Sequence, residues 1–193
     1  MQESHISQIA DEFSLPFKGV AAVLSLLSEG NTIPFISRYR KEMTGSLDEV
    51  QVREIKERAE YLGELTDRRT VILESIESQG KLSDDLKRKI EACETKSALE
   101  DLYLPYKPKR RTKATIAKEK GLEPLATLIF EQRLDVKSQE VVQEYVDEEK
   151  GVVSPEEALQ GARHIVAEWI SEEAEIREYL RTGYQQEALL CSK

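Results

Sequence analysis

Residues 48–79 read DEVQVREIKERAEYLGELTDRRTVILESIESQ, and this stretch decides the fold. It contains no proline, and its apolar residues recur at the three- and four-residue spacing of one helical face. That spacing predicts a single long helix, about 45 to 50 Å in length at a rise of about 1.5 Å per residue. Ser46 followed by Glu49 has the spacing of a capping box and predicts the start of this helix. The apolar stripe consists of Ile55, Ala59, Leu62, Leu65, Ile72 and Ile76.

Shorter helical patterns flank the long one, and no stretch shows the β-branched alternation of a half-buried strand. We therefore predict an all-α fold, a multi-helix scaffold with one long central helix and several short docked helices. Capping residues predict further helix starts at Ser83, at Ser97 with Glu100, and at Ser154 with Pro155. The sub-parts that this pattern suggests are residues 1–45, 46–150 and 151–193.

Charge is unevenly distributed along the 193 residues, whose net charge is −9. Residues 107–120 contain seven Lys or Arg against one Glu, a local charge of +6. Residues 140–180 contain twelve Asp or Glu against three Lys or Arg, a local charge of −9. The balance argues against a wholly basic nucleic-acid coat protein. The separation indicates either an internal complement of opposite charges or a field that presents one basic face.

The basic segment follows a short amphipathic helix in residues 99–113, LEDLYLPYKPKRRTK. Pro105 and Pro108 disfavour a helix there, so we expect the cations to lie on a loop. Cations neutralise phosphates, and we expect Tyr103 and Tyr106 to anchor the loop in the core rather than to stack on bases. A basic loop can also be merely solvated, or paired with carboxylates of its own chain. The candidate phosphate-contacting residues are Lys107, Lys109, Arg110, Arg111 and Lys113.

A second cationic and aromatic cluster lies in residues 31–45, NTIPFISRYRKEMTG. Arg38, Arg40 and Lys41 are expected to project outward, while Phe35, Ile36 and Tyr39 pack inward. The three cations would extend the phosphate-contacting surface if the two motifs meet in space. Taken alone, the pattern is typical of an ordinary amphipathic helix with a charged face.

Catalytic and metal-binding patterns are missing from the sequence. Cys93 and Cys191 have no metal-type spacing, and His5 and His164 lie on amphipathic helices without a partner pattern for catalysis. No phosphate-binding glycine loop, dinucleotide fingerprint or nucleophile elbow is present. We therefore expect no enzyme activity, no cofactor, no metal and no small-molecule substrate. No run is long and apolar enough for a membrane span, and the acidic amphipathic start is unlike a signal peptide, so we expect a cytoplasmic protein.

Three long segments together resemble the N-terminal region of the Tex family of bacterial transcription accessory proteins. They are residues 33–49 (IPFISRYRKEMTGSLDE), 100–126 (EDLYLPYKPKRRTKATIAKEKGLEPLA) and 154–177 (SPEEALQGARHIVAEWISEEAEIR). Two positions depart from the pattern expected for the family: Ser37 stands in place of an alanine, and His164 in place of a frequent aspartate.

The resemblance implies a cytoplasmic, multidomain, nucleic-acid-binding protein. In that family the helical N-terminal region precedes an RNase-H-like domain, a helix-hairpin-helix element and an RNA-binding OB-fold, and we expect none of these three within this chain. The end of the chain, GYQQEALLCSK, carries no helix-stopping signal, so we also expect it to be part of a longer protein.

Two hypotheses of function follow from the residues and the resemblance together. The first is a helical accessory module of a transcription-associated protein, whose basic loop binds RNA or DNA weakly and without sequence specificity. The alternative is a structural and protein-interaction scaffold that positions the later domains or docks a partner from the transcription machinery, without binding nucleic acid itself.

Overall fold

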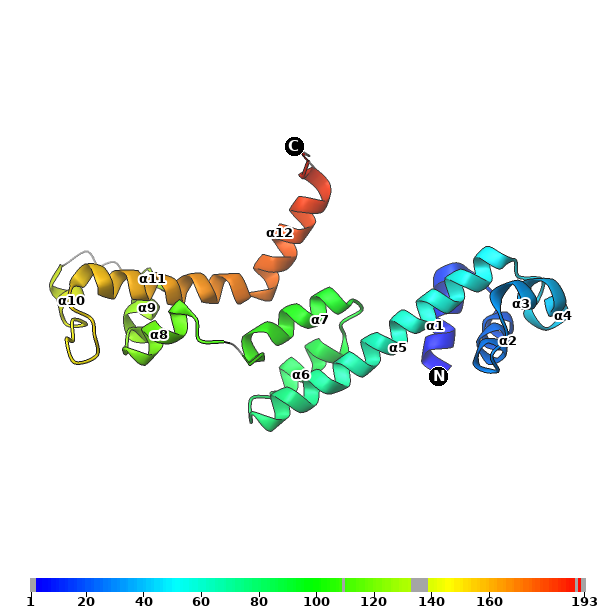
Figure 1. Ribbon diagram of the computed structural model, residues 1–193, viewed down its shortest axis with the longest axis horizontal. Coiled ribbons are helices and arrows are strands. Elements are labelled where there is room, and N and C mark those ends of the chain that lie inside the picture. Colours follow the sequence, from blue (N-terminus) through cyan, green and yellow to red (C-terminus); the bar gives the residue numbers. More distant parts are fainter. Residues whose placement is uncertain (1–2, 109, 133–138, 190, 192–193) are drawn as a thin grey trace. The chain divides into compact units, whose positions relative to one another are not determined.

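The computed structural model describes residues 3–108, 110–132, 139–189 and 191, and the helical prediction is confirmed (Figure 1). The described residues form helices joined by turns and contain no strand, and their only β-bridge joins Asp147 and Val152. The chain forms two compact units, Met1–Glu91 and Ala92–Lys193. The division between them falls inside the 46–150 sub-part that the sequence suggested, because residues 49–78 pack with the helices that precede them.

Unit 1 is organised by α5 (Glu49–Ser78), the predicted long helix. Its stripe from Val52 to Leu62 is buried against the apolar faces of the helices that precede it. Arg69, further along α5, donates from Nε to the carbonyl oxygen of Ile90 at 3.3 Å and so holds the last helix of the unit. The shorter helices are α1 (Glu3–Phe13), α2 (Phe17–Ser28), α3 (Ile33–Tyr39), α4 (Lys41–Thr44) and α6 (Asp84–Glu91).

Two of the predicted helix caps are wrong by two residues. The long helix is capped by Asp48, whose Oδ1 accepts from the Gln51 backbone N–H at 2.9 Å, and not by Ser46 with Glu49. Ser46 has a left-handed backbone with φ of 67°, so the chain is still turning there. The helix predicted to start at Ser97 is capped instead by Thr95, which accepts from the Ala98 N–H at 3.2 Å. Several residues that can cap a helix stand close together before each of these two helices. The direction of the backbone decides which of them becomes the N-cap.

The predicted caps at Ser83 and Ser154 are confirmed. Ser83 accepts from the Leu86 N–H at 3.2 Å, and Ser154 accepts from the Glu157 N–H at 3.3 Å.

Unit 2 is organised by α11 (Pro155–Glu172), which is covered by short helices. Small residues on its buried face, Ala158 and Ala162, let α8 (Lys113–Glu119) and α9 (Glu123–Phe130) approach closely. A third short helix, α10 (Gln139–Gln143), also contacts α11. The unit is completed by α7 (Lys96–Tyr103), the 3₁₀ turn η1 (Leu104–Tyr106) and α12 (Ala174–Glu187).

Two helical glycines of unit 1 have opposite surroundings. A Cβ atom built on Gly19 of α2 would lie 2.7 Å from the carbonyl oxygen of Thr44, which is closer than such contacts allow. A Cβ on Gly63 of α5 would meet no described atom within 4 Å outside its own helix backbone. Gly19 is therefore required for packing, whereas no packing contact among the described residues requires Gly63, which weakens its helix.

We expect the same substitution to have opposite effects at these two sites. Gly19→Ala should lower the free energy of unfolding by about 1–3 kcal/mol, because backbone has to move. Gly63→Ala should raise it by about 0.5–1 kcal/mol, because alanine favours the helix. Urea denaturation of both variants measures this, and a stabilising Gly19→Ala would contradict the close approach of α2 and α4.

Candidate nucleic-acid interface

The basic loop is anchored at its beginning by α7 and η1. Leu99 and Tyr103 of α7 are buried, and Tyr106 is half-buried, as expected for core anchors. Pro105 lies within the 3₁₀ turn, which ends when Lys107 becomes extended with φ of −65° and ψ of 132°. The backbone N–H of Lys107 still donates to the carbonyl oxygen of Tyr103 at 3.0 Å. The cations therefore begin directly after a fixed turn.

The other end of the loop is anchored by Thr112, the N-cap of α8. Its hydroxyl oxygen accepts from the Thr115 backbone N–H at 3.0 Å and donates to Oε2 of Glu168 on α11, also at 3.0 Å. The second oxygen of Glu168 accepts from Nζ of Lys118 at 3.2 Å. The Glu168 side chain is only 12% exposed, so this carboxylate joins the loop end to the core of unit 2.

The cations of the loop, and Lys113 at the start of α8, lie mostly toward solvent. Lys107, Arg110, Arg111 and Lys113 are all exposed, whereas Lys109 lies outside the described residues. Arg111 donates to Glu119 at 2.6 Å, with both side chains more than half exposed. The other three make no side-chain hydrogen bond or ion pair with the residues that the structure describes. An exposed pair such as Arg111–Glu119 contributes little to stability, so the guanidinium is readily available to another anion.

Lys113 also borders a hollow of about 360 Å³ between α8 and α11. Its walls include Lys120, Gln160 and His164, and Nζ of Lys120 donates to the carbonyl oxygen of Gly151 at 2.5 Å. His164 is half-buried there. No cluster of three His, Cys, Asp or Glu that could hold a metal occurs within the described residues.

The second cationic cluster belongs to unit 1. Arg38, Arg40 and Lys41 are exposed, as expected. The Arg40 guanidinium lies over the Phe35 ring at 4.9 Å, and Phe35 packs against Tyr39 with ring centroids 5.4 Å apart. Tyr39 itself is 68% exposed and does not pack inward, which corrects that expectation. The two basic clusters lie in different units: Arg38, Arg40 and Lys41 in unit 1, and the basic loop in unit 2.

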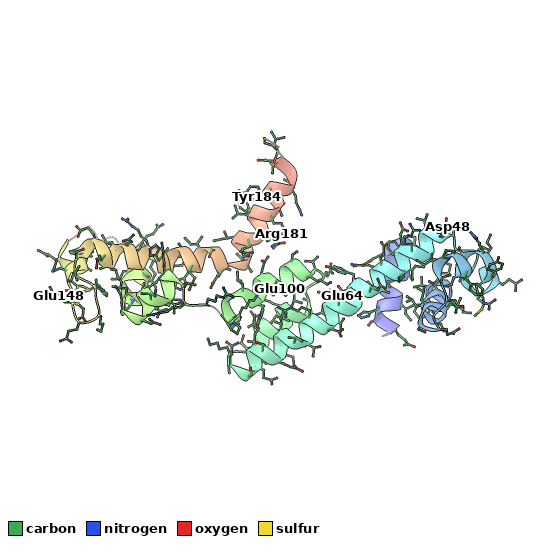
Figure 2. The ribbon with its side chains drawn as sticks, in the orientation of Figure 1. Asp48, Glu64, Glu100, Glu148, Arg181 and Tyr184 are labelled. Carbon is green, nitrogen blue, oxygen red and sulfur yellow. The ribbon has the colours of Figure 1, made fainter. Side chains whose placement is uncertain are left out.

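A buried carboxylate that sequence reasoning missed holds α12 on the helix that leads into the loop. Asp101 of α7 is 5% exposed, and its Oδ1 accepts from Nε of Arg177 at 2.6 Å. Its Oδ2 accepts from Arg181, the labelled arginine on α12 in Figure 2. Burial alone would raise the pKa of Asp101, but hydrogen bonds from Arg177 and Arg181 outweigh it and lower the pKa. The available signal was an Arg pair four residues apart in a segment otherwise rich in Glu.

Two segments of the chain match known protein families. Residues 3–77 match the Tex-like protein N-terminal domain, and residues 134–193 match the family described as Tex central region-like. The chain is 51% identical to the transcriptional accessory protein Tex of Neisseria gonorrhoeae over 181 residues, which is 93% of the chain.

The chain belongs to the Tex family. It is also 49% identical to protein YhgF of Escherichia coli over 184 residues, which is 93% of the chain. Identity falls to 30% over 174 residues, 90% of the chain, for the human S1 RNA-binding domain-containing protein 1. The chain spans about a quarter of the bacterial Tex relatives, 23% and 24% of their lengths, and 16% of the human protein. None of the helices in the described part of this Tex-family chain has the length and apolar character needed to cross a bilayer.

Removing the Asp101 charge should destabilise unit 2. Asp101→Asn leaves Arg177 and Arg181 without their carboxylate, and we expect a loss of about 2 kcal/mol in the free energy of unfolding, measured by urea denaturation. Glu178→Gln removes one charge from the exposed face of α12 and should change stability by less than about 0.5 kcal/mol. An equal effect of both variants would contradict the structural role of Asp101.

The difference in unfolding free energy between the parent and Asp101→Asn should shrink as the pH falls. Because the pKa of Asp101 is lowered from its ordinary value of 3.8, its ionised form stabilises the fold above that value. The contribution is lost as the pH falls through the folded-state pKa. The unfolding free energies of the parent and Asp101→Asn should therefore converge in acid, and a difference that grew on acidification would contradict the arrangement.

Proposed function

We propose that this chain is a non-catalytic, helical accessory module of a transcription-associated protein, with an auxiliary basic loop that contacts phosphates of RNA or DNA. The observation that carries the proposal is the arrangement of the loop. Its two ends are fixed by hydrogen bonds and buried side chains, while Lys107 and Arg110 between them, and Lys113 directly after the second anchor, are exposed. The relatives named as a transcriptional accessory protein and as an S1 RNA-binding domain protein support the same class of partner.

The anchored ends of the loop favour binding, because the loop loses less conformational freedom when a nucleic acid binds to it. A cation on a fixed loop keeps its position relative to its neighbours, so several phosphates can be met at once. The cations lie on a loop and not on a helix that could enter a groove of the nucleic acid and contact base edges. We therefore propose that the loop binds phosphates electrostatically, whatever the base sequence. We also propose a cytoplasmic location, the one that the sequence led us to expect.

The competing possibility of internal pairing accounts for only part of the basic segment. Lys118 pairs with Glu168, Lys120 with a backbone carbonyl, and Arg111 with the exposed Glu119. These contacts involve the helix that follows the loop more than the loop itself. Among the described cations of this segment, Lys107, Arg110 and Lys113 make no such contact.

A second candidate function, a protein-interaction scaffold, is favoured by α12. The helix has no buried residue, and Tyr179 and Tyr184 on it are 79% and 70% exposed. Figure 2 labels Tyr184 on this helix. Exposed tyrosines are common in protein interfaces. Under this proposal α12 packs on another protein surface and the basic loop remains solvated.

Charge reversal in the loop tests the first proposal. We expect Lys107→Glu with Arg110→Glu to weaken binding to a short single-stranded RNA by about tenfold or more, and to reduce the slope of log K against log salt by about 1.4. Lys87→Glu with Arg163→Glu, two exposed cations elsewhere on helices, makes the same change in net charge and is the control. Fluorescence anisotropy across a salt series measures both, with duplex DNA of matched length in parallel.

An unchanged affinity in the loop variant, or an equal loss in the control, would remove the loop from the function. The same titration tests the second cluster through Arg38→Glu with Lys41→Glu, which leaves the Arg40–Phe35 contact in place. If that cluster extends the surface, this variant should also lower the affinity and the salt slope. If it is only the charged face of a helix, the variant should behave like the control.

A further inference from the structure

A groove of about 860 Å³ runs along one face of α5 within unit 1. Its α5 side is a single stripe from Lys56 to Asp67, at the three- and four-residue spacing of one helical face. At about 1.5 Å per residue this stripe is about 16 Å long, or three helical turns. The facing wall comes from the end of α2 and the start of α3, and includes Leu27, Ile33 and Pro34.

The floor of the groove is formed by small residues. Ala59 is buried, and one turn further along Gly63 is half-buried with open space where its Cβ would be. Glycine inside a helix is destabilising relative to alanine, and no contact among the described residues requires it here. Small residues on a helix surface let a second helix approach closely. The combination leaves a recess in the middle of the longest helix.

The rim of the groove is acidic. Glu60, Glu64 and Asp67 follow one another along the α5 stripe, and Lys56, which lies 3.6 Å from Glu60, is the only cation among the lining residues (Figure 2 labels Glu64). The stripe therefore carries three negative charges against one positive charge. Such a rim repels the phosphates of a nucleic acid and attracts Lys or Arg.

We propose that this groove is a docking site for a basic amphipathic helix of a partner protein. The apolar face of that helix lies on Ala59 and Gly63, with side chains at i, i+3, i+4 and i+7 against Leu27 and Ile33. Its Lys or Arg residues flank the apolar face and pair with Glu60 and Asp67. The site is separate from the basic loop and does not rest on nucleic-acid binding.

The test uses a synthetic peptide of about 14 residues with leucines at i, i+3, i+4 and i+7 and lysines on both flanks. A peptide of the same charge, with serine in place of leucine, shows whether charge alone is enough. We expect saturable one-to-one binding of the leucine peptide to the full chain by fluorescence anisotropy, and at least about tenfold weaker binding of the serine peptide.

Two variants of the chain locate the binding. Glu60→Lys with Asp67→Lys should weaken binding about tenfold or more, whereas Glu54→Lys with Glu57→Lys, the same charge change on exposed positions of α5 outside the groove, should change it less than about threefold. Gly63→Leu fills the recess and should abolish binding. Leucine also favours the helix, so the same variant should raise Tm, which separates blockage from misfolding.

Absence of saturable binding would overturn the proposal, as would equal binding by the parent and Gly63→Leu. Equal losses in the two charge variants would show attraction to the acidic chain as a whole and would also overturn it. Self-association of the chain, or RNA binding, that Gly63→Leu abolishes would assign the groove to a second copy or to nucleic acid instead.

Discussion

Short helices are marginal in water, because forming the first turn costs more than one hydrogen bond returns. Most helices of this chain have fewer than a dozen residues, and each unit depends on one longer helix to stabilise them. In unit 1 the long helix α5 buries its stripe under α1, α2 and α3, and in unit 2 α11 buries Ala158, Ala162 and Ile165 under α8 and α9. The proposed groove lies where α2 ends and α3 begins beside α5, and the basic loop ends where α8 begins beside α11.

The long helix and the all-α class were predictable because they depend on local periodicity alone. Cap positions were less so: Asp48 and Thr95 compete with Ser46 and Ser97 as capping residues, and the choice depends on backbone direction set by tertiary packing. For the Asp101 site the sequence offered only the spacing of the two arginines and no indication of their partner. Its partners Arg177 and Arg181 lie more than seventy residues away in sequence, at separations of 76 and 80. Nothing in local spacing indicates which distant carboxylate an arginine pair meets.

The candidate site shows the same limit. The cation cluster was predictable from the charges in the sequence, and the loop conformation from the prolines. The ion-pair partner of each cation was not predictable. Arg111 meets Glu119 eight residues away, outside the usual helical spacings, and Lys118 meets Glu168 on another helix. The sequence stretch 99–113 is thereby divided. Its first half, with Leu99, Asp101 and Tyr103, is a buried anchor, whereas its second half carries the exposed cations.

A net charge of −9 does not exclude a polyanion partner, because charges in salt solution act over short distances. At physiological ionic strength the Debye length is about 8 Å, so a phosphate beside Arg110 responds mainly to neighbouring cations and little to remote carboxylates. The same screening makes the acidic rim along Glu60, Glu64 and Asp67 a local property of its groove. Opposite local charges thus allow one chain to attract phosphates at one surface and a basic helix at another. Under the two proposals each surface repels the partner of the other, because its own nearest charges have the wrong sign for it.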